Sequence, residues 1–530
     1  MSWLLRGALS LLRGLAGPAW RSFQESLDDP AAAQERTLRR LLARSARSRF
    51  GQSQGLAGAA PETAFERLQP TDYASLRALI ESDIATGSHH FSPERPRLYE
   101  RTSGSGGPAK YIPYDTAMRA AFDRMFRIWA YDLLQSGLRL HSGRAFMSVS
   151  PPLLGQRRAG GGVPLGVALD TDYLATHVGL LLRPFLAVPA RVLALSGADD
   201  FKDVVVAHLL AASDLEVVSV WNPTYWLVLL EHASRHLARL TGELRAGEIG
   251  RAGLRFRFRP LAAQRIGRVA CAAEQGWHTV WPHLALISCW TDAEAAGPAA
   301  GLGRLFPRVW VQGKGLLATE AAITVPIVGA PAPVPLVDDV YLELLQPDGR
   351  LLPLAQWRLG DQGELVVTQA GGFLRYRMHD QVVVAGFFRA TPCLRFQGRS
   401  GGVVDLVGEK LSEELVRSAL QGLRTDHRLL ALCPVASADP PFYALFCDAP
   451  TPHMADAVDA FLYCSPHYRV ARELHQLAPI RLVARPGLLK DWQQAMAGAG
   501  IAEGNVKATS LVVNRELAAR LWAALTQRSA

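Results

Sequence analysis

A short polar segment carries the side chains best suited to chemistry with a polyphosphate. From Thr102 to Lys110 it reads Thr-Ser-Gly-Ser-Gly-Gly-Pro-Ala-Lys, so three hydroxyls, three glycines and a lysine fall within nine residues. Glycine lets backbone N–H groups approach a ligand closely, while hydroxyl donors and a cation complement phosphate charge. The same composition is also typical of a plain flexible loop, and the segment is not the GxxxxGK[ST] phosphate loop. It is therefore a candidate phosphate loop of another kind.

The elements around this loop are predicted from hydrophobic periodicity. Apolar residues recur at helical spacing over residues 34–46 and 71–84, ahead of the loop, and an apolar face over 118–134 predicts a long helix after it. Between residues 185 and 225, short β-branched runs alternate with helical stretches, and these runs include 204–210 and 217–220. This alternation indicates an α/β sheet.

The pattern becomes rich in strands from Val340. Turns containing Pro, Gly and Asp separate the predicted strands, which cover residues 340–345, 363–368, 374–377 and 382–387. The sequence Gly-Arg-Ser-Gly-Gly then occupies 398–402, and about 130 residues remain, the size of one small domain. We therefore predict an N-terminal domain over residues 1–400 and a C-terminal domain over 401–530.

Composition excludes several classes of protein. A chain of 530 residues exceeds the usual size of one hydrophobic core, and 49% apolar with 20% charged residues is ordinary for a folded globular protein. The net charge of +9 comes from scattered arginines, without a basic run interleaved with aromatics or a zinc or helix-turn-helix signature. We therefore expect a solvated basic surface and no nucleic-acid partner.

The cysteines and the N-terminal residues indicate the cellular compartment of the protein. Six cysteines are spread widely without a CxxC pair, which is typical of a reducing compartment. Arg6 and Arg13 interrupt the apolar N-terminal stretch, so neither an integral membrane span nor a cleavable signal is expected. An amphipathic helix docked on its own domain is the favoured interpretation, with a peripheral membrane contact as the alternative. We predict a cytoplasmic protein.

Four segments in the expected order resemble the adenylate-forming enzymes, and within them the Gretchen Hagen family of acyl-acid amido synthetases, whose plant members conjugate hormone acids to amino acids. The first is the segment from 102 to 110, similar to the family's Ser/Thr/Gly-rich ATP-phosphate loop. A family member usually has Ser or Thr where Gly106 stands. A hydrogen bond from one hydroxyl to a charged phosphate is worth about 1.5–3 kcal/mol, so the glycine predicts weaker binding of ATP. The resemblance assigns the phosphates of ATP to Thr102, Ser103, Gly104, Ser105, Gly107 and Lys110.

The second segment, 312–320, is similar to the family's adenine-flanking loop that ends in Thr-Glu. The resemblance assigns Ala318 and Thr319 to the nucleotide, with Thr319 at the phosphate, and Glu320 to catalysis as the magnesium ligand. A carboxylate is the hard oxygen ligand that Mg²⁺ on a nucleotide prefers. An isolated Thr-Glu pair is otherwise typical of a helix cap.

The third segment, 372–382, resembles the family's Tyr-Arg-x-Gly-Asp strand, whose aspartate binds ribose. Asp380 suits this role because an ionised carboxylate accepts hydrogen bonds from both ribose hydroxyls. His379 stands where the family has glycine, so it either crowds the nucleoside, adds a titrating group or is simply a surface histidine.

The fourth segment comprises residues 396–399 and 407–414, followed by 466–472 and 504–507, and resembles the hinge and the mobile domain of the family. The resemblance implies nucleotide binding by Arg399 and makes Lys507 the catalytic lysine of adenylation. A cation there stabilises charge that develops on the carboxylate and α-phosphate. A lone lysine in a polar loop is otherwise a solvated side chain.

The resemblance covers roughly residues 30 to 515. It implies a large α/β N-terminal adenylate-forming domain with mixed sheets and a smaller mobile α/β C-terminal domain. It also implies ATP and Mg²⁺ as cofactors, with a carboxylic acid and an amine as substrates, and the amine of an amino acid is the favoured acceptor. Ester formation, thioester formation and a catalytically degenerate nucleotide-binding protein stay open as alternatives. The aromatic run 221–226 is as typical of core as of pocket, so no acid-binding residue and no oligomeric state is predicted.

Overall fold

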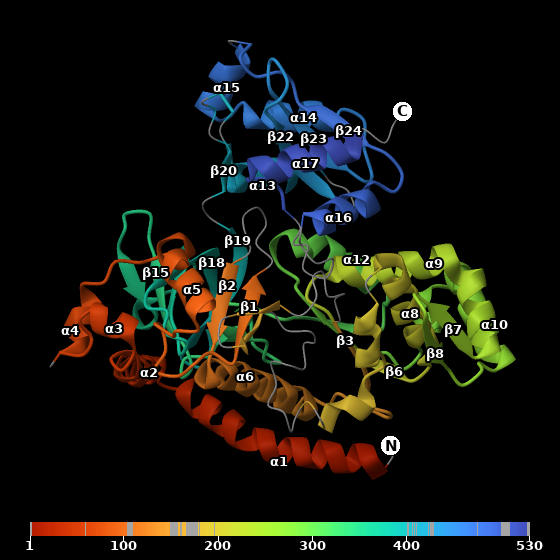
Figure 1. Cartoon of the computed structure of the whole chain (residues 1–530), viewed down its shortest axis with the longest axis horizontal. Helices are drawn as coiled ribbons and strands as arrows, with labels where there is room; N and C mark the ends of the chain where they lie inside the picture. The colour runs from red at the N-terminus through yellow and green to blue at the C-terminus, as the bar shows by residue number, and fades with distance from the viewer. Residues whose placement is uncertain are drawn as a thin grey trace.

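Helices surround several small sheets, and the last quarter of the chain forms its own group of elements above the rest (Figure 1). This arrangement confirms the predicted α/β fold class with mixed sheets. The computed structural model describes residues 3–58, 60–102, 110–148, 157–159, 162–165, 179, 181–195, 197–399, 402–404, 406–407, 409, 411–421, 423, 429–473, 475–499 and 509–526.

Aspartates begin the predicted N-terminal helices. Asp29, Asp72 and Asp115 each accept a hydrogen bond from a backbone N–H in the first turn of α2, α5 and α6, which satisfies a donor that the helix leaves open. All three helices predicted from periodicity are confirmed. The helices up to this point are α1 (Trp3–Ser26), α2 (Pro30–Ser45), α3 (Arg49–Ser53), α4 (Pro61–Glu66), α5 (Tyr73–Thr86) and α6 (Thr116–Gln135).

Helix α1 lies along α6 at the base of the molecule (Figure 1). The Arg13 guanidinium donates to the carbonyl oxygen of Leu134, and the ring centroids of Trp20 and Tyr131 are 5.6 Å apart. Part of the apolar face of α1 is therefore covered by its own domain, as the favoured interpretation of this segment requires. No helix among the described residues is long and apolar enough to cross a membrane.

A parallel sheet forms the centre of the region between residues 144 and 313. Its strand order is β10-β9-β6-β3, and every neighbouring pair is parallel. The carboxyl ends of its strands therefore meet at one edge, where open α/β sheets usually bind ligands. The strands are β3 (Arg144–Met147), β6 (Leu215–Ser219), β9 (Leu286–Cys289) and β10 (Trp310–Gly313).

The β-branched run 204–210, taken from the sequence as evidence for a strand, lies instead in a helix. It belongs to α8, and every residue of the run except His208 is buried, so the apolar run reflects a helical segment covered on nearly all sides. The run 217–220, by contrast, forms most of β6. Helices that pack with this sheet include α8 (Ala198–Ala211), α9 (Pro223–Ala246), α10 (Ala263–Ala270) and α12 (Ala296–Leu305), and a hairpin adds β7 (Glu248–Arg251) and β8 (Leu254–Arg257).

The strand-rich region beyond residue 340 forms an antiparallel sheet with the order β16-β15-β17-β18-β19. The predicted strands 374–377 and 382–387 are parts of one long strand, β18, that a bulge interrupts. The sheet consists of β15 (Tyr341–Leu345), β16 (Leu351–Pro353), β17 (Gln362–Thr368), β18 (Tyr376–Phe388) and β19 (Thr391–Arg399).

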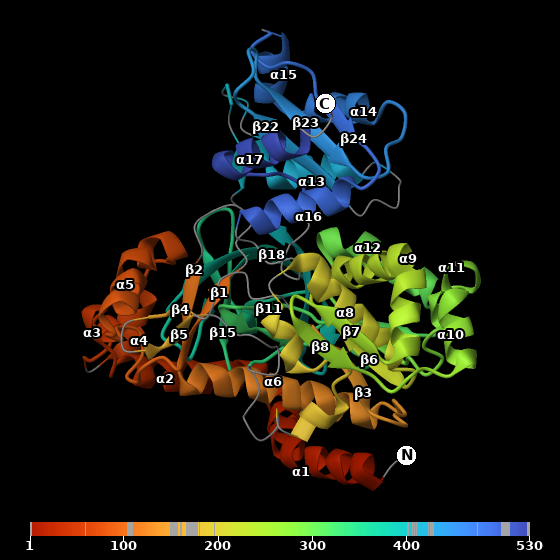
Figure 2. The same ribbon diagram turned by 45° about the vertical axis from the view of Figure 1, so that its right-hand side comes forward.

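The C-terminal elements have cores of their own. Two hydrophobic clusters draw their buried residues from 404–525 alone, and Figure 2 shows these elements above the two large sheets. Arg417 donates to the Gln397 carbonyl oxygen, and Lys490 Nζ lies 3.9 Å from Asp199 Oδ2. The domain boundary at 400/401 stays a prediction. The elements are β20 (Val403–Val404), β21 (Leu411–Ser412), α13 (Glu413–Gln421), β22 (Leu430–Val435), β23 (Phe442–Cys447), α14 (Met454–Leu462), α15 (Pro466–Glu473), β24 (Arg481–Ala484), α16 (Leu488–Gly498) and α17 (Arg515–Thr526).

A buried carboxyl on α6 gives the first testable prediction. Asp132 accepts a hydrogen bond from the Val328 N–H at 2.9 Å, but burial raises its pKa from 3.8 to about 6. The ionised form therefore opposes folding, and its cost grows as pH rises from about 4 through 6. Asp132→Asn keeps an acceptor for Val328 without the charge. We expect a higher melting temperature than wild type at pH 7, and a difference that shrinks as pH falls toward 4. A variant less stable than wild type at pH 7 would contradict this account.

Candidate active site

The candidate phosphate loop joins the two strands of a hairpin. Strand β1 (Leu98–Thr102) pairs with β2 (Lys110–Tyr114) in antiparallel register, and Thr102 lies opposite Lys110. The loop therefore starts and ends at one point in space, as a phosphate-enclosing loop must. Of its predicted ligands, Ser103, Gly104, Ser105 and Gly107 lie outside the described residues, as does Gly106, and only the backbone of Thr102 is described.

Lys110 is fixed at the base of this loop by Tyr73. Its Nζ lies 5.5 Å from the centroid of the Tyr73 ring, and the neighbouring Tyr111 N–H donates to Tyr73 Oη at 2.9 Å. Burial raises the pKa of the Tyr73 hydroxyl, so it stays a neutral acceptor at physiological pH. These contacts hold the lysine at the base of the loop.

Thr319 and Glu320 form the tip of a two-residue hairpin rather than a helix cap. Strand β11 (Leu317–Ala318) pairs with β12 (Ala321–Ala322), and Ala318 lies opposite Ala321. Glu320 is buried, and the half-buried Ala318 and Thr319 stand beside it. A turn this short fixes both side chains relative to the two strands.

A hydrogen bond connects this turn to the phosphate-loop hairpin. The Tyr114 hydroxyl, at the end of β2, donates to the carbonyl oxygen of Thr319 at 2.6 Å. Burial raises the pKa of Tyr114, and the nearby Glu100 and Glu320 carboxylates raise it further. The first and second sequence motifs therefore meet at Tyr114, with two carboxylates close to its ring.

Asp380 projects from a bulge in β18. Glu364 pairs with Gln381 and Val366 with Arg377, so the single residue Leu365 of β17 faces three residues of β18, 378 to 380. Asp380 is buried, and its backbone pairs with that of Arg399 in β19. The side chain of Arg399 is not among those described.

His379 occupies the centre of this bulge with a φ of +58°. This is the left-handed region that favours glycine, which accounts for the glycine expected at this position in the family. Its Nδ1 lies 3.4 Å from Glu364 Oε1 and its Nε2 3.9 Å from Asp72 Oδ2. Burial lowers the pKa of His379, and the positive charges of Arg377 and Lys110 lower it further. His379 approaches Asp72, and Lys110 lies over the ring of the adjacent Tyr73, so the start of α5 connects the third motif with the last residue of the first.

Part of the fourth motif can be placed. Glu409 is fully buried and accepts hydrogen bonds from the backbone N–H groups of Leu406 and Val407, both at 2.8 Å, and from the Tyr443 hydroxyl. These bonds give it a structural role at the start of the C-terminal elements. Lys507 lies outside the described residues.

Lys314 was not predicted as a site residue, and the fold brings it to the carboxyl edge of the parallel sheet. Its Nζ donates to Ser219 Oγ at 2.7 Å and lies 5.0 Å from the Trp221 ring centroid and 5.6 Å from that of Trp129. The Trp221 and Trp290 rings are 6.0 Å apart. In the sequence, the signal for this residue is a lysine one position beyond a strand. Such a lysine indicates a ligand site only when the strand is known to belong to a parallel sheet.

These features suit a magnesium nucleotide. Among the described residues, no group of three or more His, Cys, Asp or Glu side chains is arranged to hold a metal. Mg²⁺ on a nucleotide needs only one or two carboxylates beside phosphate and water ligands, so Glu320 alone fits this requirement. A loop of hydroxyls and glycines, a Thr-Glu turn and a buried strand aspartate are the combination by which this chain resembles the adenylate-forming enzymes.

Comparison with known proteins gives the family. Residues 19–299 match the GH3 family N-terminal domain, and residues 335–399 match the GH3 family central domain. The chain belongs to the GH3 family, which confirms the resemblance inferred from the four motifs.

Individual relatives agree with this membership. A rice protein (Oryza sativa subsp. japonica) named probable indole-3-acetic acid-amido synthetase GH3.12 is 24% identical over 514 residues, 81% of this chain and 80% of that protein. Another rice protein, probable indole-3-acetic acid-amido synthetase GH3.7, is 37% identical over 71 residues, 13% of this chain and only 12% of that protein.

Two solved structures share the fold. The GH3.15 acyl acid amido synthetase superposes with a TM-score of 0.79 at 16% identity, over 94% of both chains. The AtGH3.15 acyl acid amido synthetase in complex with 2,4-DB superposes with a TM-score of 0.80 at 17% identity, over 96% of both chains. These matches confirm the predicted fold class, and the ligase class predicted from the sequence is the class that these relatives are named for.

The backbone of His379 gives a prediction for this site. A non-glycine residue in the left-handed region costs about 1–2 kcal/mol, so His379→Gly should raise the melting temperature. If the histidine is a passive departure from the family's glycine, activity should be equal or higher. Ala252, with a φ of +47° in the β7–β8 turn, provides the matched control Ala252→Gly, which tests backbone relief away from the site. A large loss of activity in His379→Gly alone, with an altered pH profile near neutrality, would instead show that His379 takes part in the reaction.

Proposed function

We propose that this chain is an ATP-dependent acyl acid amido synthetase. In the first half-reaction a carboxylate oxygen of the acid attacks the α-phosphorus of ATP, and pyrophosphate leaves. In the second, an amine nitrogen attacks the acyl carbonyl of the acyl-adenylate, AMP leaves and the amine loses a proton. The observation that carries this proposal is the convergence of three motifs, through the Tyr114–Thr319 hydrogen bond and through the start of α5, where Asp72 approaches His379 and Tyr73 contacts Lys110.

The nucleotide is proposed to lie between the β1–β2 hairpin and the β18 bulge. In this arrangement the backbone and hydroxyls of Thr102, Ser103, Gly104, Ser105 and Gly107 enclose the phosphates, and the Lys110 ammonium neutralises part of their charge. The side chain of Asp380 accepts from the ribose hydroxyls. Ala318 and Arg399 complete the nucleotide contacts proposed from the resemblance. The burial of Asp380 supports this role, since a buried carboxylate gains from hydrogen-bond donors that a ligand brings.

Glu320 and Lys507 are the proposed catalytic residues. Magnesium, when bound with ATP, offsets phosphate charge, and Glu320 would hold it from the tip of the β11–β12 hairpin. Thr319, fixed by the same two-residue turn, would bind a phosphate oxygen. Lys507 is proposed to reach the site when the C-terminal domain closes, and to stabilise charge that develops between the carboxylate and the α-phosphate.

The acceptor is proposed to be the amine of an amino acid. The support is family membership and the amido synthetase names of the relatives, which include indole-3-acetic acid-amido synthetases in rice. Ester and thioester formation stay as alternatives that product analysis distinguishes.

A reducing compartment, the cytoplasm, is the proposed location. All six cysteines are free thiols. Burial raises the pKa of Cys289 and of Cys433 to about 12, so both stay protonated and inert. This use of cysteine as a small apolar core residue supports the proposal.

The function is tested by acid-dependent release of pyrophosphate. We expect wild-type protein with ATP and Mg²⁺ to release pyrophosphate when the right acid is supplied from a panel that includes indole-3-acetic acid. Hydroxylamine should trap the acyl group as a hydroxamate, and mass spectrometry with mixed amino acids should detect the amide. Glu320→Gln keeps the side-chain volume but removes the negative ligand, and should lower this rate strongly at limiting Mg²⁺.

The matched control is Asp348→Asn, which removes a carboxylate from the exposed turn between β15 and β16 and should keep wild-type activity. Wild-type rates in Glu320→Gln at limiting Mg²⁺ would show that the magnesium assignment is wrong. ATP binding without pyrophosphate release for any acid would favour the nucleotide-binding alternative over a ligase.

Lys314 is proposed to attract the carboxylate of the acid substrate. Trp221 and Trp290 are proposed to pack against the apolar body of that acid. The lysine is buried, whereas both tryptophans are half-buried and follow strands at the carboxyl edge of the sheet. An ammonium in a weakly solvated site interacts strongly with a carboxylate. An aromatic or other apolar acid matches this combination.

Lys314→Met retains the length of the side chain without its charge. We expect a KM for the acid at least ~10-fold higher, because losing a charge-assisted bond costs about 1.5–3 kcal/mol, and a KM for ATP close to wild type. The control Trp310→Phe alters an exposed residue at the opposite end of β10 and should change neither constant. A lower melting temperature with an unchanged KM for the acid would show that Lys314 serves folding alone.

A further inference from the structure

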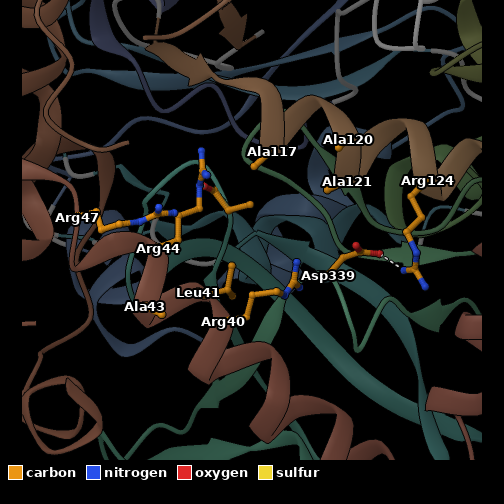
Figure 3. Close-up of a pocket in the computed structure, with 11 residues that line it drawn as sticks. Arg40, Leu41, Ala43, Arg44, Arg47, Ala117, Ala120, Ala121, Arg124 and Asp339 are labelled. Carbon is orange, nitrogen blue, oxygen red and sulfur yellow. Dashed lines mark hydrogen bonds and ion pairs between the residues drawn. The ribbon is translucent and has the colours of Figure 1, made fainter. Parts of the chain in front are cut away.

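A cavity of about 700 Å³ is lined mainly by residues of α2 and α6 (Figure 3). Its polar lining is dominated by four arginines. Thr102, Lys110, Glu320 and Asp380 do not line it. We call it the arginine groove, defined by Arg40, Arg44, Arg47 and Arg124.

Two of these arginines are held by carboxylates. Arg44 Nη2 donates to Asp115 Oδ2 at 2.6 Å, and its Nη1 donates to Glu94 Oε1 at 3.2 Å. At the other end, Arg124 donates to Asp338 Oδ1 at 2.9 Å and pairs with Asp339. Each guanidinium is thus fixed in place, and two carboxylates offset its charge.

The other two arginines keep their charge available. Arg40 is exposed and donates to the backbone carbonyl oxygen of Asp338 at 2.5 Å, a bond that does not neutralise it. Arg47 is exposed, and within the described part of the chain its guanidinium has no hydrogen bond or ion pair. Arg40 lines the groove from α2, and Arg47 lines it from the turn that follows this helix (Figure 3). In the described part of the chain neither cation has an ion pair within bonding distance, and the Asp339 carboxylate offsets part of the Arg40 charge. A ligand with one anionic group therefore finds two exposed guanidinium groups.

The rest of the lining is small and apolar. Ala117, Ala120 and Ala121 line the groove from α6, and Leu41 and Ala43 line it from α2 (Figure 3). Alanines leave space where larger side chains would close the gap between two helices, and this surface favours an apolar body over a hydrated ion. Asp339 pairs with Arg124 and lies between it and Arg40 in Figure 3, where it would repel a second negative charge.

We propose that the arginine groove is a binding site for a small organic anion with a single phosphate monoester or carboxylate headgroup and an apolar body. The headgroup lies between Arg40 and Arg47, and the body lies over the alanines of α6. Guanidinium groups suit both headgroups because they bind two oxygens at once. The site is separate from the proposed ATP and acyl sites and does not depend on the ligase activity.

Binding of 1-naphthyl phosphate to the full-length protein, measured by calorimetry in saturating ATP and Mg²⁺, tests the proposal. We expect saturable binding that is much tighter than that of inorganic phosphate or 1-naphthol, which carry the headgroup and the body alone. The double variant Arg40→Ala/Arg47→Ala should weaken it at least ~10-fold. Ala121→Phe, which fills the groove, should abolish it. A parallel titration with 1-naphthoate distinguishes a phosphate from a carboxylate as the preferred headgroup.

The matched control is Arg36→Ala/Arg39→Ala, which removes the same charge from α2 outside the groove and should leave binding and melting temperature unchanged. Equal weakening in both double variants would overturn the proposal, because it would show a general charge effect. Displacement of the probe by ATP would overturn it as well, since the probe would then occupy the nucleotide site. If Ala121→Phe does not fold, unchanged binding in Arg40→Ala/Arg47→Ala with native melting suffices to reject the site.

Discussion

The hydrogen bond from the Tyr114 hydroxyl to the Thr319 carbonyl oxygen joins segments 205 residues apart, and the candidate active site depends on it. Tyr114 is fully buried, so loss of the bond would leave a buried donor unsatisfied at a cost of about 1–3 kcal/mol. Because Thr319 and Glu320 are the whole of a two-residue turn, fixing one carbonyl also fixes the direction of the neighbouring carboxylate. The position of the proposed magnesium ligand is therefore set by a tyrosine from the hairpin that carries the phosphate loop.

Two ion pairs support the other side of the site. Arg377 makes a two-bond contact with Glu364, both bonds at 2.8 Å, on the strand that faces the bulge. Arg375 does the same with the buried Glu343 at 3.0 and 3.1 Å, and its guanidinium lies over the Phe65 ring. Both arginines lie within five residues of Asp380 on the N-terminal side of the bulge, so they anchor the strand as it enters the irregular segment. The bulge then directs Asp380 without loss of pairing on either flank.

The chain distributes positive charge over separate places. Lys110 stands at the phosphate loop, Lys314 is buried at the edge of the parallel sheet, and Arg40 and Arg47 face a groove between two helices. Each cation has different surroundings: a tyrosine ring, indole rings with a serine, and an alanine surface. The net charge of +9 therefore includes cations placed individually for different anions, in addition to the solvated basic surface expected from composition.

Sequence alone determined the chemistry of the motifs and the elements with clear periodicity. The hydroxyl- and glycine-rich loop, the Thr-Glu pair and Asp380 are recognisable because a ligand selects residue types in local order, and α2, α5 and α6 follow from local spacing and aspartate caps. The run 204–210 was misassigned because complete burial removes the periodic signal that separates strand from helix. The local sequence does not predict the left-handed backbone of His379 or the joining of two predicted strands in β18. Both features arise from the pairing of β18 with β17. Lys314 and the arginine groove were decided by tertiary structure for the same reason: their partners come from segments distant in the chain, and only packing brings those segments together.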